Sequence, residues 1–333
     1  QSANSGMDLS LWDNIISLSV DYYYRKGTDL IGLRMLPLET GYTSTTVNWA
    51  QMENEGVEVA LTTRNIHTKD FTWFTNLNFG YNDNTVLRET VAENAIKPSR
   101  EGYSVGAIFA YKTAGLDDEG YPLFLTQDGR KVTATEFFKL NNAGASTLSA
   151  EEQRNLYSYI GSTEPKVSGG FMNTFKYKRV TLGINCIFNF GMYVQTTPTY
   201  DPTNYDRGLN SNRDILNRWT PDHTNTTLPK LMTENDGRTG EYLRYKEQNL
   251  FRELDIWVKK QNYFRFESIR LGYELPEKWL KPVGIKSASV SLEGRNLWVI
   301  ASNYHNYLDP ETMGNPYAAP IPKSFIFGLN VNF

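Results

Sequence analysis

Nine short segments of this chain alternate apolar and polar residues, and the connections between them are alternately short and long. A two-residue period places successive side chains on opposite sides of a β-strand. The pattern therefore predicts an all-β fold. The nine expected strands are residues 7–11, 16–24, 57–62, 71–81, 167–177, 180–190, 264–275, 286–298 and 324–333.

The lengths of the connections indicate where such strands belong. Turns near Asp13, Asn65, Lys178 and Pro276 are short, and long connections are expected over about 25–55, 82–166, 191–262 and 299–322. Outer-membrane barrels have short periplasmic turns and long extracellular loops, whereas compact soluble domains rarely contain connections of seventy or eighty residues. We therefore expect a transmembrane antiparallel β-barrel with long extracellular loops.

Nine strands would leave two unpaired edges, which a lipid bilayer does not tolerate. We accordingly expect residues 1–333 to be the C-terminal portion of a larger barrel, with the remaining strands elsewhere in a longer protein.

The seventh strand also predicts a local irregularity. Phe264 and Phe266 are in one phase and Ile269 and Leu271 in the other, so a β-bulge is expected near Glu267 and Ser268.

Composition argues against several other classes of protein. Aromatic residues make up 14% of the chain, which suits sheet surfaces and membrane-interface girdles. A net charge of -3 does not indicate the positively charged surface that binds nucleic acid. No apolar run approaches the roughly 18 residues that a transmembrane helix needs. A single cysteine, Cys186, allows no internal disulfide and no multi-cysteine metal site. We read it as a small lipid-facing hydrophobe.

The search for catalytic and metal-binding motifs gives no positive signal. The chain has no serine elbow, HExxH, Walker loop or dinucleotide fingerprint, so we expect no enzyme and no cofactor. Its three histidines show no ligand spacing. Asp117, Asp118 and Glu119 with Asp128 contain calcium-type ligands, but their spacing is not that of an EF-hand, and solvated turn chemistry is favoured.

Several segments, in the same order as the predicted strands, resemble the SusC/RagA family of TonB-linked outer-membrane proteins over nearly the whole chain. They are DYYYRKGTD (21–29), EGVEV (55–59), residues 101–120, PKVSGGFMNT (165–174), LDIWV (254–258), YFRFESIRLGYELP (263–276), GRNLWVI (294–300), the Asp309–Pro310–Glu311 loop ahead of Pro320, and PKSFIFGLNVNF (322–333). The resemblance implies the late part of a 22-stranded barrel, in a multi-pass protein of a Bacteroidetes-like Gram-negative outer membrane.

The same resemblance implies the partners and the activity. These are a SusD-like surface lipoprotein, the TonB complex acting through a plug and contact segment outside this chain, outer-membrane lipid, and an oligosaccharide or peptide substrate that is imported without covalent change. The closing strand, Phe325, Phe327, Leu329, Val331 and Phe333, resembles the signal that outer-membrane assembly machinery recognises. Candidate contacts for the substrate or the lipoprotein are Tyr200, Tyr205, Trp219, Tyr304, Tyr307 and Tyr317, with packing inside the loops as the alternative for each.

Two readings from other classes remain open at this point. Alternation is also found in soluble sandwiches, so a soluble extracellular carbohydrate-binding or adhesive β-sandwich is the first alternative. A β-rich polysaccharide-degrading enzyme is the second, although no carboxylate pair can be identified from spacing. Glu293 and Arg295 share the polar side of one strand, where we expect an ion-pair network or a contact with substrate.

Overall fold

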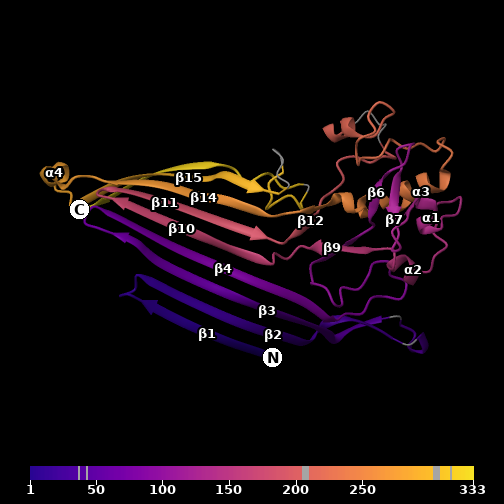
Figure 1. The fold of residues 1–333 in the computed structure, drawn as a ribbon, viewed down its shortest axis with the longest axis horizontal. Coiled ribbons are helices and arrows are strands. Elements are labelled where there is room, and N and C mark those ends of the chain that lie inside the picture. The colour runs from indigo at the N-terminus through magenta and orange to yellow at the C-terminus, as the bar shows by residue number, and fades with distance from the viewer. Residues whose placement is uncertain (37, 43, 205–209, 303–307, 316) are drawn as a thin grey trace.

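The nine predicted strands form one antiparallel sheet in which every strand pairs with its sequence neighbour among the nine (Figure 1). The computed structural model describes all residues except 37, 43, 205–209, 303–307 and 316. In spatial order the strands are β1 (Ser2–Leu11), β2 (Ile16–Met35), β3 (Ser44–His67), β4 (Phe71–Arg88), β10 (Val167–Tyr177), β11 (Val180–Phe190), β14 (Tyr263–Glu274), β15 (Ser287–Ala301) and β16 (Ser324–Asn332).

The sheet is open, and β1 and β16 are its two edges. The all-β antiparallel prediction is confirmed, and one continuous sheet replaces the two facing sheets that a sandwich requires. In the part of the chain that the structure describes, no helix has the length and apolarity needed to cross a membrane.

Short connections gather at one end of the sheet and the longer connections at the other (Figure 1). The first turn places Trp12, Asp13 and Asn14 in the left-handed region, with φ of 52°, 54° and 62°. Lys178 and Arg179 alone join β10 to β11, and Lys178 has φ of 52°. The last short connection holds two small helices, α4 (Glu277–Leu280) and η5 (Lys281–Val283).

The prediction of a long connection over 25–55 is wrong. β2 continues to Met35 and β3 begins at Ser44, so only residues 36–43 connect them, with the short helix η1 (Leu38–Thr40) inside. The pattern fails there because the pairing of β2 with β3 shifts between Gly27 and Ile31, where Asp29 has φ of 57°, and such a shift breaks the two-residue period. β4 and β15 likewise extend to Arg88 and Ala301, into the expected connections over 82–166 and 299–322.

The predicted β-bulge is confirmed. The pairing of β11 with β14 shifts between Asn185 and Cys186, which leaves Glu267 as an extra residue on β14. The pairing of β14 with β15 shifts at the same level, where Asn296 has φ of 55°. One extra residue reverses the side-chain phase, so Ile269 continues the face that Phe266 began.

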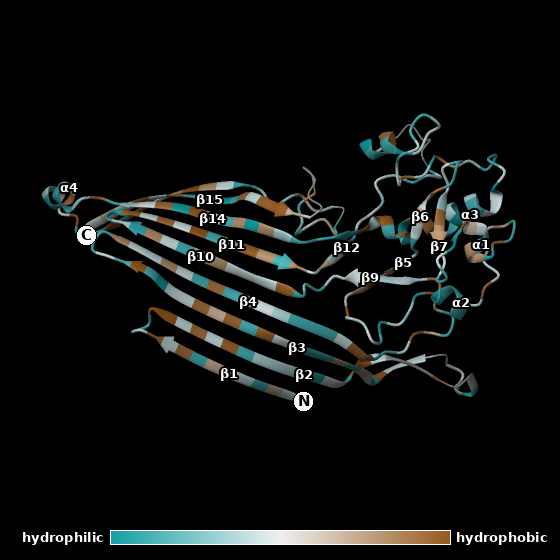
Figure 2. Cartoon of the chain, in the orientation of Figure 1, coloured by the Kyte–Doolittle hydropathy of each residue, from teal (hydrophilic) through white to brown (hydrophobic). Residues whose placement is uncertain are grey.

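Register keeps apolar and polar residues on separate faces of the sheet, which Figure 2 shows as alternating bands along the strands. One row of register partners at mid-height is apolar throughout: Leu9, Leu18, Leu61, Leu77, Phe171, Cys186, Phe266 and Trp298. A neighbouring row on the other face is almost entirely polar: Ser10, Ser17, Thr62, Asn76, Met172, Asn185, Ser268, Arg295 and Ser324.

Cys186 lies on the apolar face but is buried, contrary to the expectation of a lipid-facing side chain. Its register partners are Phe171 on one side and Phe266 on the other. The rings of Phe171 and Phe264 come from the strands on either side of β11, and their centroids are only 5.7 Å apart. A small residue between them lets large neighbours meet across the strand and cover it.

The two longest connections fold together into what we call the loop domain, residues 89–166 and 191–262. Its elements are β5 (Ala107–Ala110), β6 (Thr113–Leu116), β7 (Pro122–Leu125), β8 (Lys131–Val132), α1 (Ala134–Phe138), α2 (Ala150–Arg154), β9 (Ser158–Ser162), β12 (Tyr193–Gln195), η2 (Arg213–Asn217), α3 (Thr239–Gln248), η3 (Leu250–Glu253), η4 (Asp255–Trp257) and β13 (Val258–Lys260).

Both halves of the loop domain contribute to one hydrophobic core. Tyr111, Phe124 and Phe138 come from the first half, and Leu254 and Trp257 from the second. The halves are also hydrogen-bonded, because Tyr111 N donates to Glu253 O at 2.8 Å and Asp255 N donates to Tyr111 O at 3.0 Å. Burial raises the pKa of the Tyr111 phenol to about 12, so the ring stays neutral in this core.

The two faces of the sheet predict opposite responses to a charge. Leu77→Arg places a guanidinium in the middle of the apolar face and should cost about 2–4 kcal/mol in a bilayer. Asn78→Arg, one residue further and exposed on the polar face, should be tolerated. The measurement is the urea midpoint of unfolding of the full-length protein in lipid vesicles. Equal midpoints for the two variants would contradict the assignment of the faces.

The loop domain should lose its packing when its core is truncated. Phe138 is fully buried, so Phe138→Ala should cost about 3–5 kcal/mol there and expose residues 89–166 to limited proteolysis. Leu216→Ala, at an exposed position in the same domain, is the matched control and should leave the digest unchanged. Loss of the sheet together with the loop domain would show that the two do not fold as separate cores.

Candidate functional site

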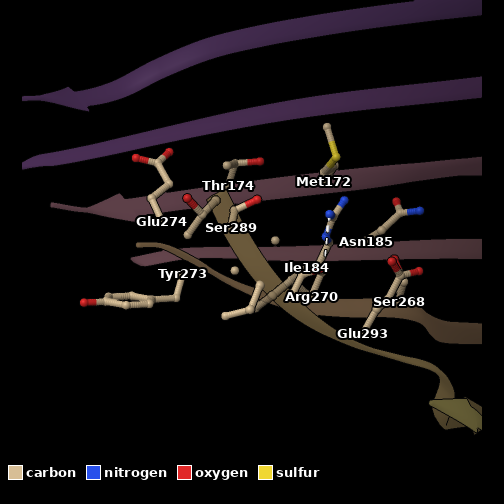
Figure 3. Close-up of a pocket in the computed structure, with 15 residues that line it drawn as sticks. Met172, Thr174, Ile184, Asn185, Ser268, Arg270, Tyr273, Glu274, Ser289 and Glu293 are labelled. Carbon is tan, nitrogen blue, oxygen red and sulfur yellow. Dashed lines mark hydrogen bonds between the residues drawn. The ribbon is translucent and has the colours of Figure 1, made fainter. Parts of the chain in front are cut away.

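The polar face of the sheet carries a trough of about 460 Å³ across β10, β11, β14 and β15. The polar side chains drawn along it in Figure 3 include Thr174, Asn185, Ser268, Arg270 and Glu293. Hydroxyl, amide and charged groups alternate here because every second residue of each strand faces this side. Such a surface can hydrogen-bond a polar ligand or another polar protein surface.

Charged residues in and beside the trough are arranged in cross-strand and same-strand pairs. Arg295 Nε lies 2.6 Å from Glu293 Oε1, as expected for an ion-pair network at these positions. Lys176 Nζ lies 2.8 Å from Glu274 Oε1. Arg270 stands opposite Glu293 in the register, and its guanidinium donates a 3.3 Å hydrogen bond to Ser291 Oγ. Exposed pairs of this kind contribute about 0–1 kcal/mol each, so they add little stability.

The residues of the closing strand stand on the apolar face. Phe325, Phe327 and Leu329 of β16 are 71%, 72% and 64% exposed, and Phe333, just beyond the strand, is 79% exposed. Val331 is half-buried opposite Ala288. Leu329 pairs with Val290 and Phe327 with Leu292, so this strand continues the apolar face at the edge of the sheet. Its role as an assembly signal stays a prediction.

The structure separates the loop aromatics that the sequence grouped together. Tyr200 is only 8% exposed: its hydroxyl donates to Pro229 O at 2.8 Å and its ring packs against Phe251. Packing inside the loop domain therefore describes Tyr200, which offers no ring face to a ligand. Trp219 is half-buried, and a Cβ at Gly120 would lie 2.4 Å from its ring.

Tyr317 is the most accessible of these aromatic residues that the structure describes, with 95% of its surface exposed. It is therefore free to contact a substrate or a partner protein, and that role stays a prediction. Tyr205, Tyr304 and Tyr307 lie outside the described residues.

The acidic cluster that could have suggested calcium is engaged in turn chemistry. Asp117 Oδ1 accepts hydrogen bonds from the backbone N–H of Glu119 and Tyr121, and Arg238 lies 2.7 Å from Asp117 Oδ2. Asp128 accepts from Thr126 and Arg130, and these hydrogen bonds lower its pKa to about 2. Among the residues described, no three His, Cys, Asp or Glu side chains are grouped so that they could hold a metal ion.

A buried ion cluster anchors the loop between β15 and β16 to the polar side of β14. Arg265, 3% exposed, lies 2.5 Å from Asp309 through one nitrogen and 2.5 Å from Glu311 through another. Glu311 N in turn donates to Asp309 Oδ1 at 3.0 Å. Sequence reasoning noted Asp309–Pro310–Glu311 as a motif but missed its partner. Asp309 and Glu311 are 44 and 46 positions from Arg265, so no local pattern points to this pairing.

No protein-family model matches the chain. Among curated relatives, TonB-dependent receptor P3 of Formosa agariphila is 27% identical over 98% of the chain and 33% of the relative. TonB-dependent receptor SusC of Bacteroides thetaiotaomicron is 22% identical over 99% of the chain and 31% of the relative. The resemblance to TonB-dependent receptors of the SusC/RagA type is confirmed. The chain spans about a third of the length of the curated relatives it matches.

Solved structures agree with this resemblance at the level of the fold. The RagAB peptide importer in its "closed-closed" state has a TM-score of 0.75 over the whole chain and 35% of that protein, with 24% identity. The "open-open" state gives 0.74 with 22% identity. The nine-stranded sheet and its loops therefore share their fold with about a third of each of these chains.

Removal of the anchoring arginine should release the β15–β16 loop. Arg265→Met leaves two carboxylates without their cation, and breaking a buried pair in this way costs about 3–5 kcal/mol. We expect faster amide hydrogen exchange at residues 308–313. Adding Asp309→Asn and Glu311→Gln should recover part of the protection, because the amides carry no charge.

Arg295→Met is the matched control for that experiment, since it breaks an exposed pair on the neighbouring strand. It should leave exchange at 308–313 unchanged. Unchanged exchange in Arg265→Met would show that the cluster does not hold the loop.

Proposed function

We propose that this chain forms part of the wall of a TonB-dependent outer-membrane importer. The observation that carries the proposal is the exposed apolar face with a polar face behind it. β10 has eleven residues, all within the banded part of the sheet. At about 3.4 Å per residue and a tilt near 45°, such a strand rises about 25 Å, which is the height of the apolar band of outer-membrane barrels. Lipid would cover the apolar face and the lumen would lie behind it.

Aromatic residues at the upper and lower limits of the apolar face support this orientation. Tyr22 and Tyr81 are exposed toward the loop-domain end, and Trp12, Tyr177 and Trp279 toward the short-turn end. Aromatic girdles mark both interfaces of outer-membrane barrels. Because outer-membrane barrels have short periplasmic turns and longer extracellular loops, the short turns would be periplasmic, and the loop domain together with the β15–β16 loop would be extracellular.

The two edges of the sheet require further strands in the membrane. β1 and β16 each have one unpaired side among the described residues, and unpaired backbone groups in hydrocarbon cost several kcal/mol each. We propose that strands outside this chain close the barrel, to a total of 22 by the SusC/RagA resemblance, with this chain as its C-terminal portion. A plug and a TonB-contact segment outside the chain would open the barrel for transport, using energy supplied by the TonB complex.

The names of the relatives support part of a proposal for the substrate. SusC is a TonB-dependent receptor by name, and the RagAB structures are described as a peptide transporter or importer. We propose an oligosaccharide or peptide too large for porins, delivered by a SusD-like surface lipoprotein that docks on the extracellular loops. Import would involve no covalent change to the substrate. The polar trough would face the lumen.

The soluble carbohydrate-binding sandwich has less support. It needs a second layer to cover the apolar face, and the described residues form only one large sheet with that face exposed. A polysaccharide-degrading enzyme would need a pair of carboxylates facing one cleft. In the trough, Glu274 and Glu293 are each in an ion pair or beside a cation instead.

The proposal can be tested with the complete parent gene in its native bacterium. We expect the protein in the outer-membrane fraction, soluble only in detergent, with a heat-dependent shift in gel mobility. Deletion of the gene should abolish growth on at least one oligosaccharide or peptide source, and a protonophore should stop uptake of that compound by the wild type. Recovery as a soluble monodisperse protein would overturn the proposal and favour the sandwich.

A further inference from the structure

A hollow of about 230 Å³ lies where β4 extends beyond its last partner on β10. One side of it is β4, and the other side comes from the segments next to β5 and β9. The lining residues are 82–85, 102–104, Tyr159, Ser162, Glu164 and Lys166. Drug-sized ligands occupy about 300–1,000 Å³, so this smaller hollow suits a single ring rather than a longer chain. We call it the β4-edge pocket.

The edge of β4 in this pocket has main-chain groups free for a ligand. Past its last pair with β10, β4 makes a bond from Asn82 N to Lys166 O at 3.0 Å, and the next bond on that edge joins Val86 N to Tyr103 O at 2.8 Å. Every second residue of a strand points its N–H and C=O to the same edge, so Asn84 points there too. Among the described residues, neither of these groups of Asn84 is hydrogen-bonded on that edge.

The unused pair of Asn84 is notable because this residue is only 8% exposed. Its side chain is fully engaged: Oδ1 accepts from Val105 N at 2.7 Å, and Nδ2 donates to Asn54 Oδ1 at 2.8 Å. A buried polar group that lacks a partner costs about 1–3 kcal/mol. A ligand that both donates and accepts a hydrogen bond would remove that cost.

Two tyrosines form an aromatic wall of the β4-edge pocket. The rings of Tyr103 and Tyr159 are stacked, with centroids 4.7 Å apart, yet they remain 41% and 39% exposed. Phe109 packs edge-on against Tyr103, with centroids 5.3 Å apart. Rings held by such contacts lose little conformational entropy when a ligand binds, and they offer apolar surface beside a hydroxyl group.

The rest of the lining is polar. Lys166 Nζ lies 3.3 Å from Asp83 Oδ1, so these two charges offset each other. Glu164 is exposed and forms no ion pair with the described residues, which leaves the lining with two carboxylates and one ammonium. Burial raises the pKa of the Tyr159 phenol, so this hydroxyl keeps its proton and can donate. The excess carboxylate disfavours an anionic ligand.

We propose that the β4-edge pocket binds one pyranose ring of a neutral carbohydrate. A sugar ring has an apolar C–H face, which can pack on a tyrosine, and hydroxyl groups that both donate and accept. The main chain of Asn84, the Glu164 carboxylate and the Tyr159 hydroxyl are partners for those hydroxyls. An aliphatic side chain would leave the Asn84 groups unpaired. This site rests on the proposed import function for the origin of its sugar, which is either the imported oligosaccharide or the carbohydrate of the cell surface.

The probes are the methyl glycosides of glucose, galactose and mannose, measured by ligand-observed NMR on the full-length protein in a detergent without a sugar headgroup. At least one should bind with roughly millimolar Kd, as expected for a ligand of this size. The uronic acid of the same sugar adds a carboxylate and should bind roughly tenfold more weakly. N-acetylglycine N-methylamide has the donor and acceptor of a peptide strand but no ring, and it should also bind roughly tenfold more weakly.

Tyr159→Leu should weaken binding of that glycoside roughly tenfold, because it removes the ring and keeps an apolar side chain. Tyr159→Phe keeps the ring and should retain most of the binding. Tyr42→Leu is the matched control, since Tyr42 is 72% exposed and lies outside the pocket lining. It should have no effect. The heat-dependent gel shift and limited proteolysis of the loop domain show that each variant is folded.

Growth on the nutrient identified by the gene deletion distinguishes the two origins of the sugar. Slower growth of the Tyr159→Leu strain would assign the ring to the imported compound, and unchanged growth with weaker binding would assign it to the cell surface. No binding of any of the three glycosides, equal or tighter binding of the amide, or unaltered binding in Tyr159→Leu would each overturn the proposal. None of these three results would change the outcome of the import test.

Discussion

Register between neighbouring strands holds the apolar and polar faces of the sheet apart, and the rest of the structure depends on it. A slip of one residue in any strand would move that strand's apolar side chains to the other face. The bulge at Glu267 shows how the constraint is met where the sequence changes phase: one extra residue restores Ile269 and Leu271 to the apolar side. At Cys186 a small side chain stands on the apolar side of β11. It leaves room for the rings of Phe171 and Phe264, from the strands on either side, to pack together over it.

A separate hydrophobic core supports the loop domain. Its buried aromatics, among them Tyr111, Phe124 and Phe138, pack on one another rather than on the sheet. This arrangement leaves the sheet's apolar face free, as a membrane-facing wall requires. It also holds the long connections in one conformation, which strand pairing alone could not do. Ordering the backbone of a loop costs conformational entropy, and burial of side chains offsets that cost.

The sequence predicted the parts of the fold that local pattern determines. The strands at 167–177 and 180–190 have the predicted bounds, because alternation and a two-residue turn define both ends. The ends of β2 and β3 were missed, since the register of this strand pair shifts near Asp29 and the two-residue period is interrupted there. The core of the loop domain joins residues more than a hundred positions apart, so no period reveals it. For the same reason the sequence could not decide between a ligand contact and packing inside the loops for Tyr200, and it showed no partner for Arg265.

The shared core also determines what can be exchanged among relatives. The two halves of the loop domain are separated in the sequence by the β10–β11 hairpin, yet Tyr111 from one half packs in the same core as Leu254 and Trp257 from the other. Neither half retains its packing partners if only one is replaced. Recombination that changes the outer surface of such a protein has to carry both segments together, with the hairpin between them, as one cassette of about 175 residues.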